Sequence, residues 1–181
     1  ELGLLRDLYF NDQSIPSFHN IVYLDIEIEI IGALNAQTIR DAEAEVTSMV
    51  LYDATTKKKY CWVLDKSKKF KNINRNSVDV IFCKSEKELL MLYLDKWKEI
   101  DPTIVTHWNG DFFDIPYLYY RIKKLLGNLV YKMSPIGKIK EDLYNPMSPI
   151  TLGLVSSLDF MLLFKKFITK EEPSYKLDEI G

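Results

Sequence analysis

Three acidic side chains alternate with isoleucines in one short stretch of the chain, residues 23–30 (Tyr-Leu-Asp-Ile-Glu-Ile-Glu-Ile). In an extended strand, Asp25, Glu27 and Glu29 would point to one face and the isoleucines to the other. Neighbouring carboxylates repel one another unless water or a cation lies between them. The stretch therefore has two interpretations. It is either the solvated face of an ordinary strand or part of a metal site whose other ligands come from elsewhere in the chain.

A further acidic candidate, Asp114, lies where a predicted strand turns into a predicted helix. Residues 103–108 form a short apolar strand, residues 109–111 (Asn-Gly-Asp) indicate a turn, and Pro116 lies in the first turn of a helix that Gly127 ends. Strand ends in open α/β sheets are where sites form. Asp is also a common helix N-cap, so the local sequence leaves both roles open for Asp114.

The rest of the chain predicts the elements that must position these acids. Ser85 forms a capping box with Glu88 and begins an amphipathic helix that ends at Asp101, before a proline. Asp159 is expected to be the N-cap of a later helix. The other expected elements are strands at 21–30, 46–52, 59–64 and 155–158, loops at 32–45 and 66–77, an irregular hairpin at 136–153, and helices over 160–167 and from 173. This order predicts an α/β fold with a mixed central sheet flanked by helices.

Composition and charge limit the classes of protein to consider. With 181 residues and 47% hydrophobic content, the chain can bury one full core. A formal net charge of −2 does not by itself favour nucleic-acid binding, although lysines occur in runs such as 57–59. Cys61 and Cys83 lack metal-site spacing and are expected to be reduced thiols. The sequence has no apolar run of the ~20 residues that span a bilayer, so no membrane segment is expected.

Taken together, the two acidic stretches resemble the first and second exonuclease motifs of family B DNA polymerases. The first is Asp-x-Glu at 25–27, and the second is Asn-x-x-x-Phe-Asp-Ile-Pro-Tyr at 109–117. Residues 121–127, 134–140, 157–167 and 173–177 are similar to further blocks of the T-even-phage branch of that family. The resemblance extends from Val22 to the C-terminus, and six blocks in the right order make it far more specific than Asp-x-Glu alone.

The resemblance implies a ribonuclease-H-like 3′→5′ proofreading exonuclease domain with an inserted β-hairpin and two divalent cations, Mg²⁺ or Mn²⁺. It assigns Asp25 to a position bridging the two metals, Glu27 to the metal that activates water, and Asp114 to the other side. Two cations can serve both ends of an in-line displacement at phosphorus. Glu29 is extra to the motif and is expected to be a nearby carboxylate that either faces solvent or supports the metal ligands without binding the metal.

The substrate implied is the 3′ end of single-stranded or frayed DNA, which such sites hold by stacking and backbone contacts. Asn109 is expected to hydrogen-bond the terminal nucleotide, and Phe113 or Phe112 to stack on a base, with one ring facing in and the other out. Lys138 and Lys140, in a hairpin at 138–152, are expected to contact phosphate.

The resemblance also sets the expected organisation and location of the protein. Residues 1–20 are expected to lead in from a preceding domain, and residues 21–181 to form the exonuclease domain of a longer chain with polymerase domains. The location implied is the cytoplasm, of the host cell if the protein is phage-encoded. The sequence predicts no particular oligomeric state.

One element of the family pattern is not matched. The family carries a fourth acid in a Tyr-x-x-x-Asp motif, whereas Tyr175 and Asp178 are spaced Tyr-x-x-Asp. We therefore expect Tyr175 to be a packing residue, and this fragment to bind Mg²⁺ or Mn²⁺ weakly and to degrade DNA poorly. Two alternatives are a non-catalytic DNA-binding module with a retained exonuclease fold, and a free-standing nuclease of the same class that acts on RNA or short oligonucleotides.

Overall fold

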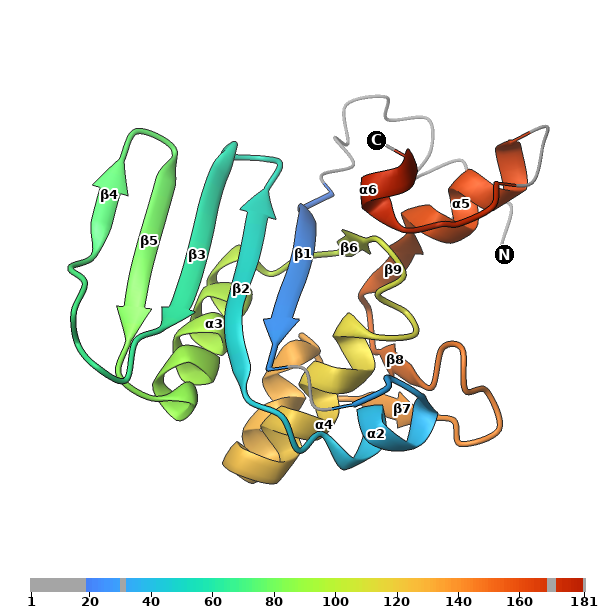
Figure 1. Ribbon diagram of the computed structural model, residues 1–181, viewed down its shortest axis with the longest axis horizontal. Helices are drawn as coiled ribbons and strands as arrows, with labels where there is room; N and C mark the ends of the chain where they lie inside the picture. Colours follow the sequence, from blue (N-terminus) through green and yellow to red (C-terminus); the bar gives the residue numbers. More distant parts are fainter. Residues whose placement is uncertain (1–18, 30–31, 169–171, 181) are drawn as a thin grey trace, which may run out of the picture.

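A seven-stranded mixed sheet forms the centre of the computed structural model, which describes residues 19–29, 32–168 and 172–180 (Figure 1). The strand order is β4-β5-β3-β2-β1-β6-β9. β1 pairs antiparallel with β2 and parallel with β6, and β9 lies parallel to β6. The strands are β1 (Ile21–Ile28), β2 (Val46–Asp53), β3 (Lys58–Leu64), β4 (Ile73–Arg75), β5 (Val78–Cys83), β6 (Ile104–His107) and β9 (Ser156–Asp159). This arrangement confirms the predicted α/β fold, and it is consistent with a ribonuclease-H-like sheet.

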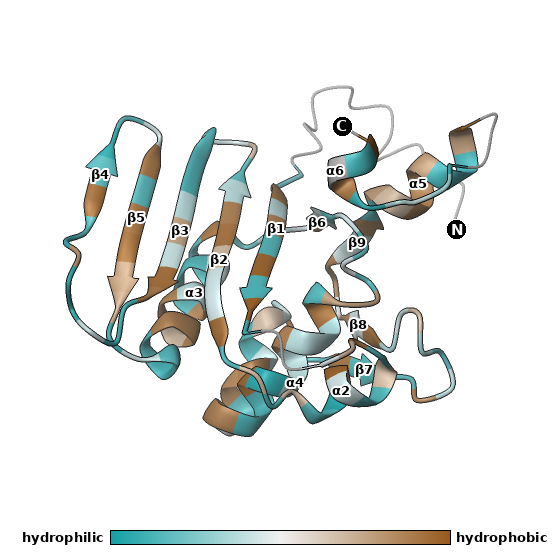
Figure 2. Ribbon diagram, in the orientation of Figure 1, coloured by the Kyte–Doolittle hydropathy of each residue, from teal (hydrophilic) through white to brown (hydrophobic). Residues whose placement is uncertain are grey.

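The core lies between this sheet and two long helices, α3 (Glu86–Ile100) and α4 (Asp114–Leu126); in Figure 1, α3 passes behind β2 and β3. Along β1 one face is buried at Val22, Leu24 and Ile26, while the residues between and after them, Tyr23, Asp25 and Glu27, are exposed; Figure 2 shows alternating hydropathy along the strand. Trp62 of β3 packs edge-on against Tyr93 of α3, and both are almost fully buried. The alternation therefore fixes which face of β1 carries the acids.

Smaller elements lie around the sheet and the two long helices (Figure 1). They are α2 (Ala36–Asp41), the 3-10 helix η1 (Gly127–Met133), the hairpin of β7 (Ile139–Glu141) and β8 (Ile150–Leu152), α5 (Phe160–Phe167) and α6 (Leu177–Ile180). β8 packs against α4, and α5 packs against β6 and β9. Within the described residues, no helix has the length and apolar character needed to cross a membrane.

The predicted helix ends are confirmed. Ser85 accepts a hydrogen bond from the Glu88 amide at 3.3 Å, and α3 ends at Asp101, whose φ of 50° is left-handed. α4 ends at Gly127, also at positive φ. Asp159 caps α5 by accepting from the amides of Met161 and Leu162. These ends depend on local chemistry, which is why the sequence reveals them.

Several expectations about elements differ from the structure. β1 ends at Ile28, and Ile30 lies outside the described residues, as do residues 1–18 of the predicted lead-in. The predicted loop at 32–45 contains α2, whose N-cap Asn35 accepts from two backbone amides in a capping box with Thr38. The loop predicted at 66–77 includes β4, and β5 was not predicted at all. β5 is a central strand whose pairing with β3 is set by the whole sheet.

Candidate active site

The site begins with a gap in the sheet beside β1. β6 pairs with β1 only across Ile21 to Tyr23 and ends at His107, so the second half of β1 has a free edge on that side. Asn109, at a φ of 62°, and the following Gly110 turn the chain out of the strand direction. A Cβ atom at Gly110 would lie 2.3 Å from Cγ of His107, so only glycine fits this turn. The chain then enters α4, whose first residue is Asp114.

Asp114 occupies the gap. Its Oδ1 accepts a hydrogen bond from the Ile26 amide on the free edge of β1 at 3.1 Å, and the side chain is 3% exposed. The N-cap position belongs to Phe113, which makes no side-chain cap, so the alternative role of Asp114 as an ordinary N-cap is wrong. The first residue of α4 is thus fixed directly beside Asp25.

Asp25 and Asp114 form an electrostatically strained pair. Burial and the neighbouring Asp25 carboxylate raise the pKa of Asp114 to about 8. Burial and the charge of Glu27 also raise the pKa of Asp25. Like charges at close range disfavour the ionised forms, and a bound cation would reverse this effect. The oxygen donors and their unrelieved repulsion therefore fit a hard divalent cation.

The exposed carboxylates of the same strand end differ in their relation to this pair. Glu27 projects from β1 on the same face as Asp25, opposite Ser48 of β2. Glu29 is exposed beyond the end of β1, where its amide bonds to the Glu45 carbonyl at 3.0 Å. The structure thus places Asp114 beside Asp25, and Glu27 next to Asp25 on the same face of β1, with Glu29 one step farther along the chain. Within the described residues, the ligand atoms of Asp25, Glu27 and Asp114 do not all lie within 4.8 Å of one another.

The side of the sheet that carries Asp25 is open to ligands. A groove of about 540 Å³ runs beside Asp25 and is lined by aromatic residues including Tyr52, Trp108 and Phe160. The Tyr23 ring lies 5.6 Å from that of Tyr52 and 6.4 Å from that of Phe160. The sequence reasoning missed this groove, although the alternation in β1 already placed Tyr23 on the face of Asp25.

A second acidic group lies at the end of β6 and β9. His107, Asp111 and Asp159 each offer a ligand atom within 4.8 Å of the others, so this group could hold a metal ion. The same atoms already make protein contacts. Asp159 accepts from the amides of Asn109 at 3.1 Å and Asp111 at 3.3 Å as well as capping α5. Asp111 accepts from the Ser157 hydroxyl.

The imidazole of His107 completes this second network in its neutral form. Its Nδ1 accepts from the Gly110 amide at 3.1 Å, and its Nε2 is 2.7 Å from the Ser157 hydroxyl. Burial lowers the pKa of His107. A neutral ring with the proton on Nε2 satisfies both contacts, so the group holds the turn at residues 109–111 against α5.

The residues predicted to contact DNA lie in two places, the stretch from Asn109 to Phe113 that precedes α4 and the hairpin that carries Lys138 and Lys140. Asn109 is at the turn, partly buried, with its amide on Asp159. Phe112 and Phe113 are both partly buried against the core, so the expected division into one inward and one outward ring is wrong. Phe113 packs 5.6 Å from the ring of Tyr117.

Lys138 and Lys140 are exposed on the predicted hairpin. The hairpin exists as β7 and β8, and Lys140 Nζ lies 3.9 Å from an oxygen of Asp142. Since β8 packs against α4, the hairpin lies next to the helix that begins with Asp114. No contact within the described residues joins either lysine to the acids.

Comparison with known proteins agrees with this arrangement. A family model described as DNA polymerase family B, exonuclease domain, matches residues 8–180. The chain belongs to this family. It is 46% identical over 102 residues to a DNA-directed DNA polymerase of Escherichia phage RB69, and 36% identical over 102 residues to one of Enterobacteria phage T4. A DNA polymerase of Thermococcus litoralis is 39% identical over 72 residues.

These relatives are much longer than the chain. The matches to the two phage polymerases cover 54% of this chain but 11% of each relative, and the match to the Thermococcus litoralis polymerase covers 40% of this chain and 4% of that protein. The family uses divalent metal ions, which agrees with an acidic site of this kind.

Proposed function

We propose that this chain is the 3′→5′ proofreading exonuclease domain of a DNA-directed DNA polymerase, and that it removes the terminal nucleotide from single-stranded or frayed DNA. The observation that carries the proposal is the buried Asp114 carboxyl group, held on the free edge of β1 beside Asp25. Perturbed carboxylates that open to a groove are typical of catalytic sites. The names of the phage relatives support a polymerase as the parent protein.

Asp25, Glu27 and Asp114 would hold two divalent cations, Mg²⁺ or Mn²⁺, in this proposal. Carboxylate oxygens are the ligands that these ions prefer. Bound ions of this kind supply charge stabilisation at the attacking and leaving oxygens of phosphodiester hydrolysis.

The remaining roles are carried by neighbouring residues of the chain. The Ile26 amide keeps Asp114 oriented toward Asp25. Asn109 would hydrogen-bond the terminal nucleotide from the turn, and Phe113 would offer its exposed edge to the terminal base. Lys138 and Lys140 would attract the phosphate backbone from the hairpin. Such contacts hold a single strand without reading its sequence.

The proposal extends to organisation and location. Residues 1–20 would lead in from a preceding domain, residues 21–181 would form the exonuclease domain, and polymerase domains would be its partners in the parent chain. The two phage relatives favour the host-cell cytoplasm as the place of action. Since Tyr175 and Asp178 do not match the Tyr-x-x-x-Asp motif that carries the fourth acid, we expect weak metal binding and slow hydrolysis from the 181-residue chain.

The test compares two carboxylates of the same stretch. Asp25→Asn should weaken Mn²⁺ binding, measured by calorimetry, by at least about 10-fold. It should also slow the shortening of a 5′-labelled single-stranded oligonucleotide. Glu29→Gln is the matched control, because it removes one exposed charge of the same stretch beyond β1, and it should behave as the unsubstituted chain. Equal losses in both variants would mean that Mn²⁺ responds only to the general negative charge, and the proposed site would be wrong.

A further inference from the structure

A buried ion pair lies between α3 and α4, close to the start of β2. Arg121 of α4 donates from Nε to Oε1 of Glu86 at 2.7 Å and from Nη2 to Oε2 at 2.6 Å. Both side chains are more than nine-tenths buried. Glu86 is the first residue of α3, so this two-pronged contact joins the two core helices.

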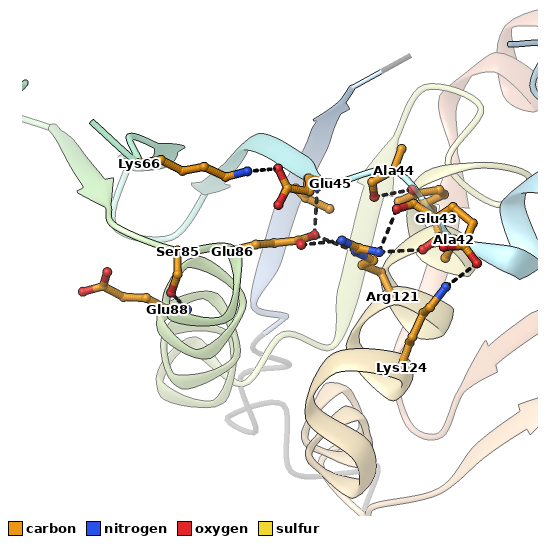
Figure 3. Close-up of polar contacts among 12 residues, drawn as sticks. Ala42, Glu43, Ala44, Glu45, Lys66, Ser85, Glu86, Glu88, Arg121 and Lys124 are labelled. Atoms are coloured by element: carbon orange, nitrogen blue, oxygen red, sulfur yellow. Dashed lines mark hydrogen bonds and ion pairs between the residues drawn. The ribbon is translucent and has the colours of Figure 1, made fainter. Parts of the chain in front are cut away.

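The same pair also binds the segment that leads into β2. Arg121 Nη1 donates to the carbonyl oxygens of Ala42 at 2.8 Å and Glu43 at 3.0 Å, and Glu86 Oε1 accepts from the Val46 amide at 2.9 Å. Figure 3 shows the guanidinium group lying between Glu86 and these carbonyls. β2 pairs with β1 along the length that carries Asp25 and Glu27. The ion pair therefore contacts α4, which carries Asp114, and the segment that leads into β2, which pairs with the strand that carries Asp25 and Glu27.

The position of Arg121 along α4 relates it to Asp114. Asp114, Tyr117 and Arg121 follow a spacing of three and then four residues, so they lie on one face of the helix. The Tyr117 hydroxyl donates to the Ala44 carbonyl at 2.6 Å, and Arg121 binds the two residues before it. Two successive turns of α4 are thus attached to the 42–46 segment, which fixes the rotation of the helix about its axis.

We propose that Arg121, through its paired contact with Glu86 and the 42–43 carbonyls, is a positioning residue that sets the rotation of α4 and thereby holds Asp114 against the Ile26 amide. The inference deepens the proposed exonuclease function, on which its relevance to metal binding rests. A planar guanidinium fork specifies direction as well as charge, which a lysine ammonium does not. Supporting shells must hold metal ligands to within about 0.5 Å, so a small rotation of α4 would matter at Asp114.

The test uses the 181-residue chain and a readout that needs no metal. Hydrogen exchange at the Ile26 amide reports the bond to Asp114, and exchange at the Ala54 amide, which donates to Ile21 at the other end of β1, reports general opening. In Arg121→Lys, Ile26 should exchange at least about 10-fold faster than in the unsubstituted chain, beyond any change at Ala54, because the weakening of a single hydrogen bond has an effect of this size on local opening. Mn²⁺ binding should weaken by a similar factor.

Two further variants separate positioning from stability. Arg121→Met with Glu86→Leu removes both charges together and so leaves no unpaired buried charge, although the Val46 amide and the 42–43 carbonyls lose their partners. Exchange at Ala54 reports the resulting loss of stability, and Ile26 should still exchange faster beyond that change. Lys124→Met is the matched control, because it removes a partly exposed lysine that contacts Asp41 and Glu43 from the same helix, and it should leave Ile26 protected.

The possible outcomes distinguish the positioning role of Arg121 from the proposed metal site. If Ile26 and Ala54 accelerate by the same factor in Arg121→Lys, or if the double variant protects Ile26 fully, Arg121 only stabilises the fold and the positioning role is wrong. If the unsubstituted chain fails to bind Mn²⁺ while Ile26 responds as expected, the proposed metal site is wrong and the control of Asp114 by Arg121 stands.

Discussion

Two groups of acidic side chains lie at neighbouring strand ends, and they differ in where their oxygens point. In the second group, Asp159 accepts from four backbone amides, and Asp111 accepts from Ser157. In the first group, Asp114 accepts from the Ile26 amide, and its pKa is raised by burial and by Asp25. The carboxylate oxygens of the second group already accept hydrogen bonds that hold the fold together. Those of the first group repel one another, and a bound cation would relieve that repulsion.

The difference shows that closeness of acidic groups does not identify a metal site by itself. His107, Asp111 and Asp159 are close enough to bind an ion, yet a cation there would compete with helix capping and a turn. A cation at Asp25 and Asp114 would instead relieve an existing cost of burial. Substitutions in each of the two acidic groups test this difference.

The largest expected effect on stability is at Asp159. Asp159→Ala should lower the free energy of unfolding by about 3 kcal/mol, because a helix cap and the amide bonds of the 109–111 turn are lost together. Asp25→Ala should cost little or should stabilise the metal-free chain, since it removes repulsion. Urea unfolding of both variants in EDTA measures this. Similar losses of stability in both would show that the two groups do not differ in structural role.

The next largest effect concerns pH. The pKa of Asp114 is about 8 in the folded chain against an ordinary value of 3.8, so between these values the folded state holds a proton that the unfolded state has released. The free energy of unfolding should therefore fall as pH rises from about 4 to 8. Asp114→Asn cannot titrate and should lack this fall.

The measurement is thermal unfolding in EDTA at both ends of that range. The two chains should be alike near pH 4, and Asp114→Asn should melt at least about 5 °C higher near pH 8. Adding Mn²⁺ should recover stability in the unsubstituted chain alone. Parallel pH curves for the two chains would contradict the raised pKa of Asp114.

The smallest expected effect is at Asp111. Asp111→Asn keeps a carbonyl oxygen to accept from Ser157, so Mn²⁺ affinity should change by less than about twofold, well below the 10-fold or greater loss typical of a disturbed metal site. Calorimetric titration of this variant beside Asp25→Asn makes the comparison direct. A large loss at Asp111 would move the metal site to the second group.

The sequence was most informative where structure depends on local chemistry. Ser85, Asp159 and Gly127 were predicted as helix ends, because capping uses amides within a few residues. Asn35 is likewise a capping residue, for α2. This helix was missed because it has only 6 residues, too few to show a helical period. β5 was missed although residues 78–83 (Val-Asp-Val-Ile-Phe-Cys) are rich in the β-branched and aromatic residues that strands favour, because they form one short run directly after a polar loop.

The part of the site that depends on local sequence was predictable. Alternation placed Asp25 and Glu27 on one face, whereas the local sequence left Asp114 open between a helix cap and a ligand, and only the resemblance favoured the ligand. The bond from the Ile26 amide, 88 residues away, could not be read from the local sequence. The contacts of Arg121 to Glu86 and to residues 42–43 span 35 to 79 residues of sequence. No local pattern encodes such a meeting, since it depends on how two helices and a strand pack together.

The turn at Asn109 and Gly110 has a wider consequence. If these residues continued in extended form, β6 would run on beside Leu24 and Ile26 and would pair with the amide that now binds Asp114. The acidic site thus depends on the early end of β6. Two residues end this strand: Asn109, which has a left-handed backbone, and Gly110, where a side chain would not fit beside His107. A larger residue at Gly110 would act on the site by changing the length of the sheet, without touching any carboxylate.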